Sequence, residues 1–179
     1  VIARPRGEQA RTLEEMQGFL AAQFGWVQPA PEQAKQTPRF PLFVSLSGKK
    51  CVVFGAGRIA ARRAEVLRRF GAQVRVIAQE SRSDLVPDVR RGYEKSDLSG
   101  AFLAVAATDD RNVNRQITQD CAACGILCSA ADCAAESTFF FPAVCEGSGL
   151  IAGVVSDGSA HRKTAAAANR IRAVLEAME

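Results

Sequence analysis

Residues 50–60 read KCVVFGAGRIA, a short apolar strand pattern followed by a glycine-rich turn that opens a helix. The turn matches the pattern G-x-G-x-x-A in the position where a dinucleotide fingerprint occurs. Gly55 permits a tight turn, Gly57 lets a pyrophosphate approach the backbone, and Ala60 lets the helix pack closely on the strand. The helix N-terminus adds N–H donors and positive partial charge. The stretch therefore predicts dinucleotide binding; the alternative is a glycine-rich turn in a fold that binds no nucleotide.

Strand and helix patterns alternate on the C-terminal side of this turn. A helix is expected from about Arg58 to Phe70, and a weak strand signal lies near Tyr93. The other expected elements are strands at 73–77, 102–108 and 126–128 and a helix at 112–124. Strands that alternate with helices favour a Rossmann-like, doubly wound α/β fold with a parallel sheet and right-handed crossovers.

The two ends of the chain have different patterns. Thr12 and Glu15 form a capping box before an amphipathic helix, and a proline-containing linker follows. Beyond residue 132, two strands (138–144 and 150–155) flank a Glu146–Gly149 turn, and a helix is expected at 164–178. Because this region cannot bury both of its faces alone, we expect it to form a homodimer. The expected parts are a helical extension and linker (1–37), a Rossmann-like domain (38–132) and a dimerisation hairpin with a C-terminal helix (133–179).

The composition narrows the class of protein. Of 179 residues, 47% are hydrophobic and 23% are charged, which is the balance of a globular protein. The net charge of +4 comes without a dense basic block, so we expect no nucleic-acid partner. The apolar runs have strand length, so we expect no membrane partner. The six cysteines are interpreted as small thiols, and no secretory signal is evident, so we expect a cytoplasmic location.

Four sequence landmarks occur in an order that resembles a known family. They are FPLFV at 40–44, the glycine turn at 55–60, AATDD at 106–110 and FFFPA at 139–143. The series resembles the dehydrogenase/chelatase module at the start of siroheme synthases and in stand-alone precorrin-2 dehydrogenases. The resemblance implies an enzyme that oxidises precorrin-2 to sirohydrochlorin by passing a hydride to NAD.

The resemblance also implies roles for particular residues. NAD would be held at Arg58 and Ile59 in the turn, and at Gln79 and Glu80 after the second strand. Thr108 ends a central strand, where open α/β sheets bind ligands. Asp132 matches a family aspartate that takes the proton released with the hydride; the alternative is a helix or turn cap. Some family members also use this aspartate when they insert iron.

Three further expectations depend on local patterns. Ala78 stands where NAD sites usually carry an acidic residue. However, Gln79 and Glu80 could still reach the ribose, and no arginine is immediately placed for a 2′-phosphate, so NAD is favoured over NADP. His161, Arg162 and Lys163 form a basic cluster that could bind the carboxylates of precorrin-2, or be a solvated helix face. The spacing of Cys121, Cys124 and Cys128 offers no clear fourth ligand, so no metal site is expected.

Two alternatives concern the reaction itself. The family continues with several helices where this chain has one, so we expect dehydrogenation more than iron insertion. A different class of function is a non-catalytic NAD-sensing module of the potassium-transport-regulator type. Such a module would share the glycine turn but would not require Asp132, the Phe-rich segment or the basic cluster.

Overall fold

The computed structural model describes residues 39–156 and 161–178, apart from the side chain of His161. Residues Phe40–Glu179 form one compact unit. The capping box at Thr12 and Glu15, and the helix expected after it, lie outside the described residues.

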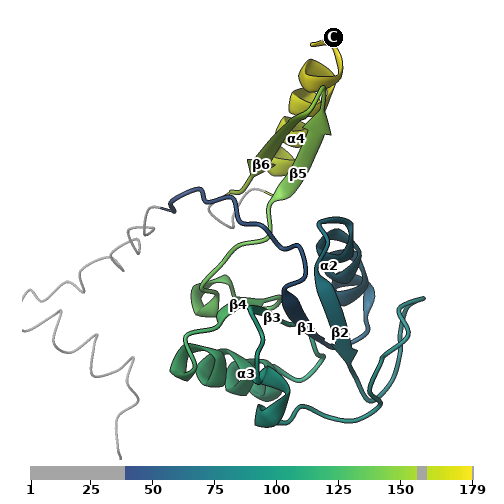
Figure 1. Ribbon diagram of the computed structural model, residues 1–179, viewed down its shortest axis with the longest axis vertical. Coiled ribbons are helices and arrows are strands. Elements are labelled where there is room, and N and C mark those ends of the chain that lie inside the picture. The colour runs from purple at the N-terminus through teal and green to yellow at the C-terminus, as the bar shows by residue number, and fades with distance from the viewer. Residues whose placement is uncertain (1–38, 157–160, 179) are drawn as a thin grey trace, which may run out of the picture. The chain divides into compact units, whose positions relative to one another are not determined.

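A four-stranded parallel sheet forms the centre of this unit, with the strand order β2-β1-β3-β4. The strands are β1 (Lys50–Phe54), β2 (Gln73–Ile77), β3 (Leu103–Ala106) and β4 (Leu127–Ala130). Helices α2 (Arg58–Arg69) and α3 (Arg111–Ala123) cover opposite faces of the sheet (Figure 1). This arrangement confirms the predicted doubly wound α/β fold.

The residues of β1 show how the two faces are divided. Cys51 and Val53 pack in the core that contains the buried face of α2, whereas Val52 and Phe54 pack in the core that contains α3. All four side chains are buried because a parallel strand in the middle of a doubly covered sheet alternates between two apolar layers. The continuous apolar run therefore marks a central strand.

The connection from β2 to β3 contains no α-helix. A 3-10 helix, η1 (Lys95–Leu98), is the regular element there, and the weak strand predicted near Tyr93 is wrong. Instead, Val89 makes an isolated parallel bridge with Ile77, and the Val76 N–H donates to the Asp88 carboxylate at 2.7 Å. The side chain of Asp88 thus takes the acceptor role that a neighbouring strand would supply.

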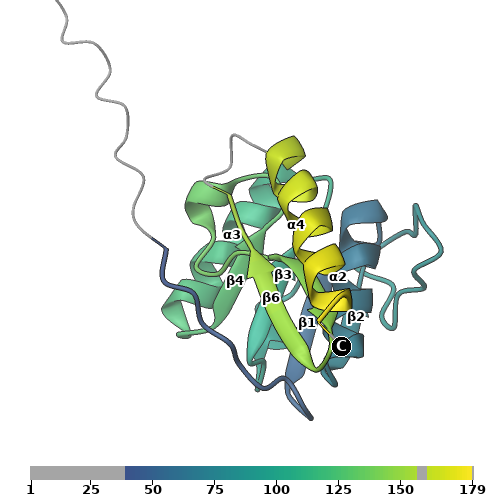
Figure 2. The same cartoon turned by 90° about the horizontal axis from the view of Figure 1, so that it is seen from above.

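After a 3-10 helix, η2 (Ala134–Glu136), the chain forms an antiparallel hairpin of β5 (Ala143–Gly147) and β6 (Leu150–Val154). Ser148 and Gly149 connect the strands, both with positive φ (47° and 72°), as a two-residue hairpin turn with right-handed twist requires. Helix α4 (His161–Glu176) runs alongside the hairpin (Figure 2). Cys145, Ala168 and Leu175 are buried between them.

The prediction of a strand from residue 138 was wrong, because 138–142 are irregular and β5 begins at Ala143. Thr138 is attached to the edge of β4: its hydroxyl accepts from the Cys128 N–H at 2.7 Å, and its own N–H donates to the Cys128 carbonyl at 2.8 Å. Phe139 and Phe141 then pack on the core beneath α2. These aromatic side chains are therefore packed on the parallel-sheet core and do not form a hairpin strand.

Candidate functional site

A cleft of about 270 Å³ lies at the carboxyl ends of β1, β2 and β3. Gly55, Gly57, Gln79, Glu80 and Thr108, all named from the sequence, line it together. Open α/β sheets bind ligands at this edge, where the loops after neighbouring strands converge. The structure thus brings the glycine turn, the end of the second strand and the end of the central strand to one site.

The two glycines of the turn meet different constraints. Gly55 has φ +100°, and a Cβ there would lie 2.2 Å from the Ala107 carbonyl oxygen, so this residue lets the turn pass close to the end of β3. Gly57 is the N-cap of α2, with no side-chain cap, and a Cβ there would meet nothing within 4 Å. The space over Gly57 and the uncapped helix N-terminus fit an anionic pyrophosphate.

The other two residues assigned to the turn are placed differently. Arg58 and Ile59 begin α2 and are exposed, and neither lines the cleft. Their backbone N–H groups belong to the first turn of the helix, so they could contribute to an anion site through the main chain. The structure therefore supports a main-chain role for them more directly than a side-chain role.

Several residues that line the cleft were not assigned to it from the sequence, among them Arg82, Arg91 and Tyr93. The Tyr93 ring packs edge-on against Phe54, with 5.0 Å between ring centroids, and its hydroxyl donates to Asp120 at 2.8 Å. Burial, together with this hydrogen bond, raises the pKa of the Tyr93 hydroxyl. Tyr93 forms part of the cleft wall. The sequence signal near it was a weak strand pattern, which did not predict a place in the cleft.

Both arginines in the cleft have carboxylate partners. Arg82 pairs with Asp109 at 2.5 Å, and both side chains are exposed. Arg91 donates to both carboxylate oxygens of the buried Asp97, at 2.8 and 2.6 Å. This bidentate hydrogen bonding holds the pKa of the Asp97 carboxyl below its usual range. Positive charge thus lies at the cleft but is already paired.

Asp132 is linked to the cleft through a single buried side chain. The Asn114 Nδ2 donates to the Asp132 carboxylate at 3.0 Å and to the Thr108 carbonyl at 3.0 Å. The Thr108 N–H and hydroxyl contact the Asn114 Oδ1 at 3.0 and 2.8 Å. Asp132 does not itself line the cleft, but one side chain connects it to Thr108, which does.

A second group of charges surrounds Asp132. The Asp132 carboxylate, whose side chain is 32% exposed, lies 3.7 Å from the Arg111 Nε. Arg111 also forms an ion pair with Glu136, and the hydrogen bond from Arg111 lowers the pKa of the Glu136 carboxyl. Arg111 is therefore shared between two carboxylates, and Glu136 is the nearer of them.

The basic cluster at the start of α4 is separate from the cleft lining. Arg162 and Lys163 are exposed, and the lining of the cleft includes no residue of α4. The side chain of His161 lies outside the described part of the chain. The cluster therefore stays a prediction that the cleft geometry does not support.

The cysteines and carboxylates give no sign of a metal centre in the described residues. No three His, Cys, Asp or Glu side chains come together there as metal ligands would. All six cysteines are free thiols; four are buried, Cys133 is half-buried and Cys124 is exposed. Among the described helices, none combines the length and the apolar character needed to cross a bilayer.

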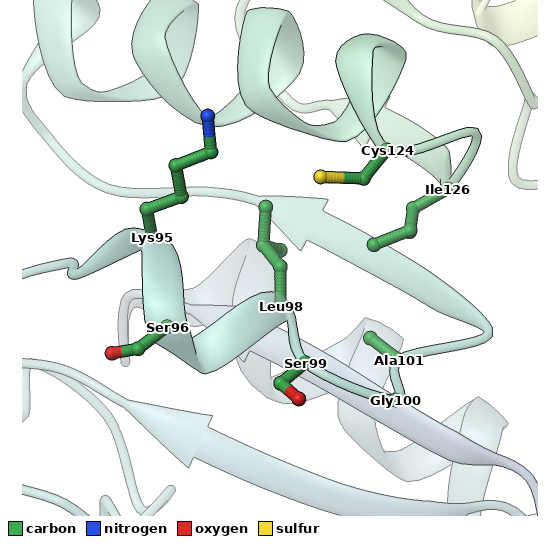
Figure 3. A pocket seen from close by; sticks show the side chains of 8 residues that line it. All are labelled: Lys95, Ser96, Leu98, Ser99, Gly100, Ala101, Cys124 and Ile126. Atoms are coloured by element: carbon green, nitrogen blue, oxygen red, sulfur yellow. The ribbon is translucent and has the colours of Figure 1, made fainter.

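A larger hollow, of about 420 Å³, lies at the opposite edge of the sheet, beside the amino ends of β3 and β4. The side chains of Lys95, Leu98 and Cys124 lie around it (Figure 3). Lys95 is paired with Asp120 at 3.1 Å. Gly100 and the first residues of η1 also line this hollow, but its lining includes neither the 55–60 glycine turn nor the N-terminus of an α-helix.

The doubly wound sheet, the glycine turn and the cleft together define a dinucleotide-binding domain. A family profile described as "Putative NAD(P)-binding" matches residues 42–143. The "Probable multifunctional siroheme biosynthesis protein HemA" of Ruminiclostridium josui is 41% identical over 150 residues, which are 79% of this chain and 29% of the relative. The "Siroheme synthase" of Ectopseudomonas mendocina is 40% identical over 126 residues, 67% of this chain and 27% of the relative.

A solved structure, "SirC, precorrin-2 dehydrogenase", has a TM-score of 0.62 over 76% of this chain and 71% of that one, at 22% identity, and supports the fold. The chain therefore belongs to the siroheme synthase N-terminal / precorrin-2 dehydrogenase family of NAD(P)-binding domains. It spans less than a third of the length of the two curated relatives.

Proposed function

We propose that this protein catalyses the NAD-dependent oxidation of precorrin-2 to sirohydrochlorin in siroheme biosynthesis. The observation that carries the proposal is the hydrogen-bonded connection from the cleft, through Thr108 and Asn114, to Asp132. A domain that only sensed NAD would need the glycine turn but not a carboxylate held beside it. The names and identities of the siroheme synthase relatives support the same reaction.

The cleft supports NAD as the cofactor. Gly55 and Gly57 leave room for the pyrophosphate, and Gln79 and Glu80 line the cleft at the end of β2, where an adenosine ribose binds in this fold. Arg82 could attract a 2′-phosphate, but its charge is paired with Asp109. We therefore propose NAD over NADP, which a comparison of the two dissociation constants by calorimetry would test.

The proposed reaction removes two hydrogens from precorrin-2, one as a hydride and the other as a proton. Bound NAD supplies the chemistry of hydride acceptance. The Asp132 carboxylate accepts the proton, a role that fits a partly exposed side chain held by a hydrogen bond from Asn114. The Arg111 Nε lies 3.7 Å from the Asp132 carboxylate, on the side where Arg111 also pairs with Glu136.

Recognition of the substrate would depend on its carboxylates. We propose that His161, Arg162 and Lys163 contribute to this recognition through charge, since guanidinium and ammonium groups bind carboxylates well. Iron insertion would be a separate activity, which the assay described below also tests. A cytoplasmic location is proposed with the enzyme, consistent with six free thiols.

A homodimer formed by the hairpin is also proposed. Helix α4 covers one face of β5 and β6, while Ile151 and Val155 are exposed. A two-stranded sheet is marginally stable by itself, so a second copy on its open face would bury these side chains. Light scattering at micromolar concentration should give the mass of a dimer. A stable monomer would contradict this part of the proposal.

One anaerobic assay tests the reaction. Precorrin-2 and NAD are incubated with the protein, and the absorbance of sirohydrochlorin is followed. Conversion that depends on both protein and NAD is the expected result. Tight NAD binding without conversion would instead favour a nucleotide-sensing module. Repeating the assay with ferrous or cobaltous ion would show whether the metal is inserted.

A further inference from the structure

We propose that Asn114 is a positioning residue that holds the Asp132 carboxylate in place beside the cofactor cleft. The inference rests on the proposed function, in which Asp132 accepts a proton. Asn114 belongs to the first turns of α3 and is only 1% exposed. In the proposed reaction the Asn114 amide accepts neither the proton nor the hydride, so we assign it a role in orienting other groups.

The hydrogen bonds fix which way the amide faces. The Thr108 backbone N–H can only donate, so the atom 3.0 Å from it must be the Asn114 oxygen. The nitrogen must then face the Thr108 carbonyl and Asp132. A donor is therefore aimed at Asp132 by the fold itself, independently of any choice between two similar amide orientations.

All four hydrogen-bonding positions of the amide are used. Three go to Thr108, which lines the cleft, and the fourth goes to Asp132. An asparagine costs helix stability relative to alanine, and burying an amide is costly unless it is fully bonded. The cost of a buried asparagine in this helix is offset by its hydrogen bonds, which connect Thr108 in the cleft wall to the Asp132 carboxylate.

No other described side chain holds Asp132 at hydrogen-bonding distance. Arg111, three residues earlier on the same face of α3, lies 3.7 Å away and is paired with Glu136. The Arg111 guanidinium can attract the carboxylate without fixing its direction. Asn114 therefore sets the orientation of Asp132, and Arg111 adds charge.

The test is a double-mutant cycle on the full chain. The variants are Asn114→Ala, Asp132→Ala and the two combined. Asn114→Asp is the second variant at this position, since it keeps an oxygen toward the Thr108 N–H but removes the donor toward Asp132. Thr138→Val is the matched control, because it deletes a side-chain hydrogen bond to β4 without touching Asp132. Each protein is measured for kcat, KM for precorrin-2, NAD dissociation constant and thermal midpoint.

A positioning role predicts a loss of kcat that acts through Asp132. Asn114→Ala should lower kcat about 10- to 100-fold, as misplacement of a reacting group does, with NAD affinity within about threefold. In the Asp132→Ala background the same change should alter kcat by less than about threefold, because coupled residues are not additive. The control should lower the thermal midpoint without changing kcat.

Three outcomes would overturn the inference. They are a parental kcat in Asn114→Ala and Asn114→Asp, fully multiplicative losses in the double variant, and a loss of NAD affinity that accounts for the loss of rate. If the parent does not oxidise precorrin-2, the proposed function fails, and crystal structures decide the positioning role separately. A displaced Asp132 carboxylate in Asn114→Ala would then support it, and an unmoved carboxylate would overturn it.

Discussion

The two edges of the parallel sheet differ in what they offer a ligand. The cleft at the carboxyl edge measures about 270 Å³ and is lined by a glycine turn, the uncapped start of α2 and the polar ends of β2 and β3. The hollow at the amino edge is larger, at about 420 Å³. It is lined by the side of η1, the end of α3 and the loop before β3.

The difference indicates that polar groups converging on a cleft mark the functional edge of the sheet. At the carboxyl edge, the glycine turn and the uncapped start of α2 border the cleft, and Asn114 connects Asp132 to the cleft-lining Thr108. At the amino edge, charged groups are used within the fold: Lys95 pairs with Asp120, and Lys50 donates to the carbonyls of Asp97 and Ser99. Substitutions at the carboxyl edge should therefore alter cofactor binding or turnover. Substitutions at the amino edge should alter stability or have no measurable effect.

The largest effect is expected for Asp132→Ala. Loss of the proton acceptor should lower turnover about 100- to 10,000-fold, the usual contribution of general acid–base catalysis. NAD affinity should be retained, and the thermal midpoint should stay close to the parental value. Anaerobic turnover and thermal unfolding on one preparation check this. A stable variant with parental turnover would remove Asp132 from the mechanism.

Gly57→Asp should have the next largest effect. It places a carboxylate in the open space over the turn, where the cofactor pyrophosphate is expected. Like charges in close contact cost several kcal/mol, so NAD affinity should fall at least about thirtyfold by calorimetry. Gly57→Ala is the comparison variant, because its Cβ meets no protein atom within 4 Å and it adds bulk without charge, so the further loss in Gly57→Asp measures the effect of charge. Unchanged NAD affinity in a folded Gly57→Asp protein would contradict the assignment of the cleft.

At the amino edge, Lys50→Met should change stability and leave function unchanged. It removes two hydrogen bonds from the Lys50 ammonium, to the carbonyls of Asp97 and Ser99 at 3.2 and 2.6 Å. A loss of roughly 1–2 kcal/mol is expected, which lowers the thermal midpoint by about 3–8 °C. NAD affinity should stay within about twofold. A large loss of affinity without a loss of stability would mean that the two edges are not separate.

The smallest effect is expected for Lys95→Ala. The Lys95 side chain is 64% exposed, and pairs of this kind contribute little in water. Neither the thermal midpoint nor NAD affinity should change measurably. A clear loss of NAD affinity would show that the larger hollow takes part in cofactor binding.

The sequence predicted the fold through patterns that are local. The apolar run of β1, the glycine turn and the buried positions of α2 each depend on neighbours within a few residues, and the structure confirms them. The glycines after α2 and α3, Gly71 and Gly125, have positive φ, as helix ends require.

Contacts that depend on distant parts of the chain could not be predicted in this way. Phe139 and Phe141 have a strand-like composition, but Thr138 bonds to β4 and places them on the parallel-sheet core. Arg82 and Tyr93 enter the cleft from an irregular connection with no periodicity. Asn114 lies four residues beyond the AATDD stretch, and its bonds to Thr108 and Asp132 exist only after three elements have come together.

An NMR titration of the isotope-labelled protein with NAD tests most directly which edge binds the cofactor. The amide signals of Gly55, Gly57 and Thr108 should shift in a saturable manner, because they lie at the carboxyl-edge cleft. The signals of Gly100 and Ala101, at the amino-edge hollow, should stay in place. In Gly57→Asp the first set of shifts should require far more NAD. Saturable shifts at Gly100 and Ala101, with Gly55, Gly57 and Thr108 unmoved, would contradict the account.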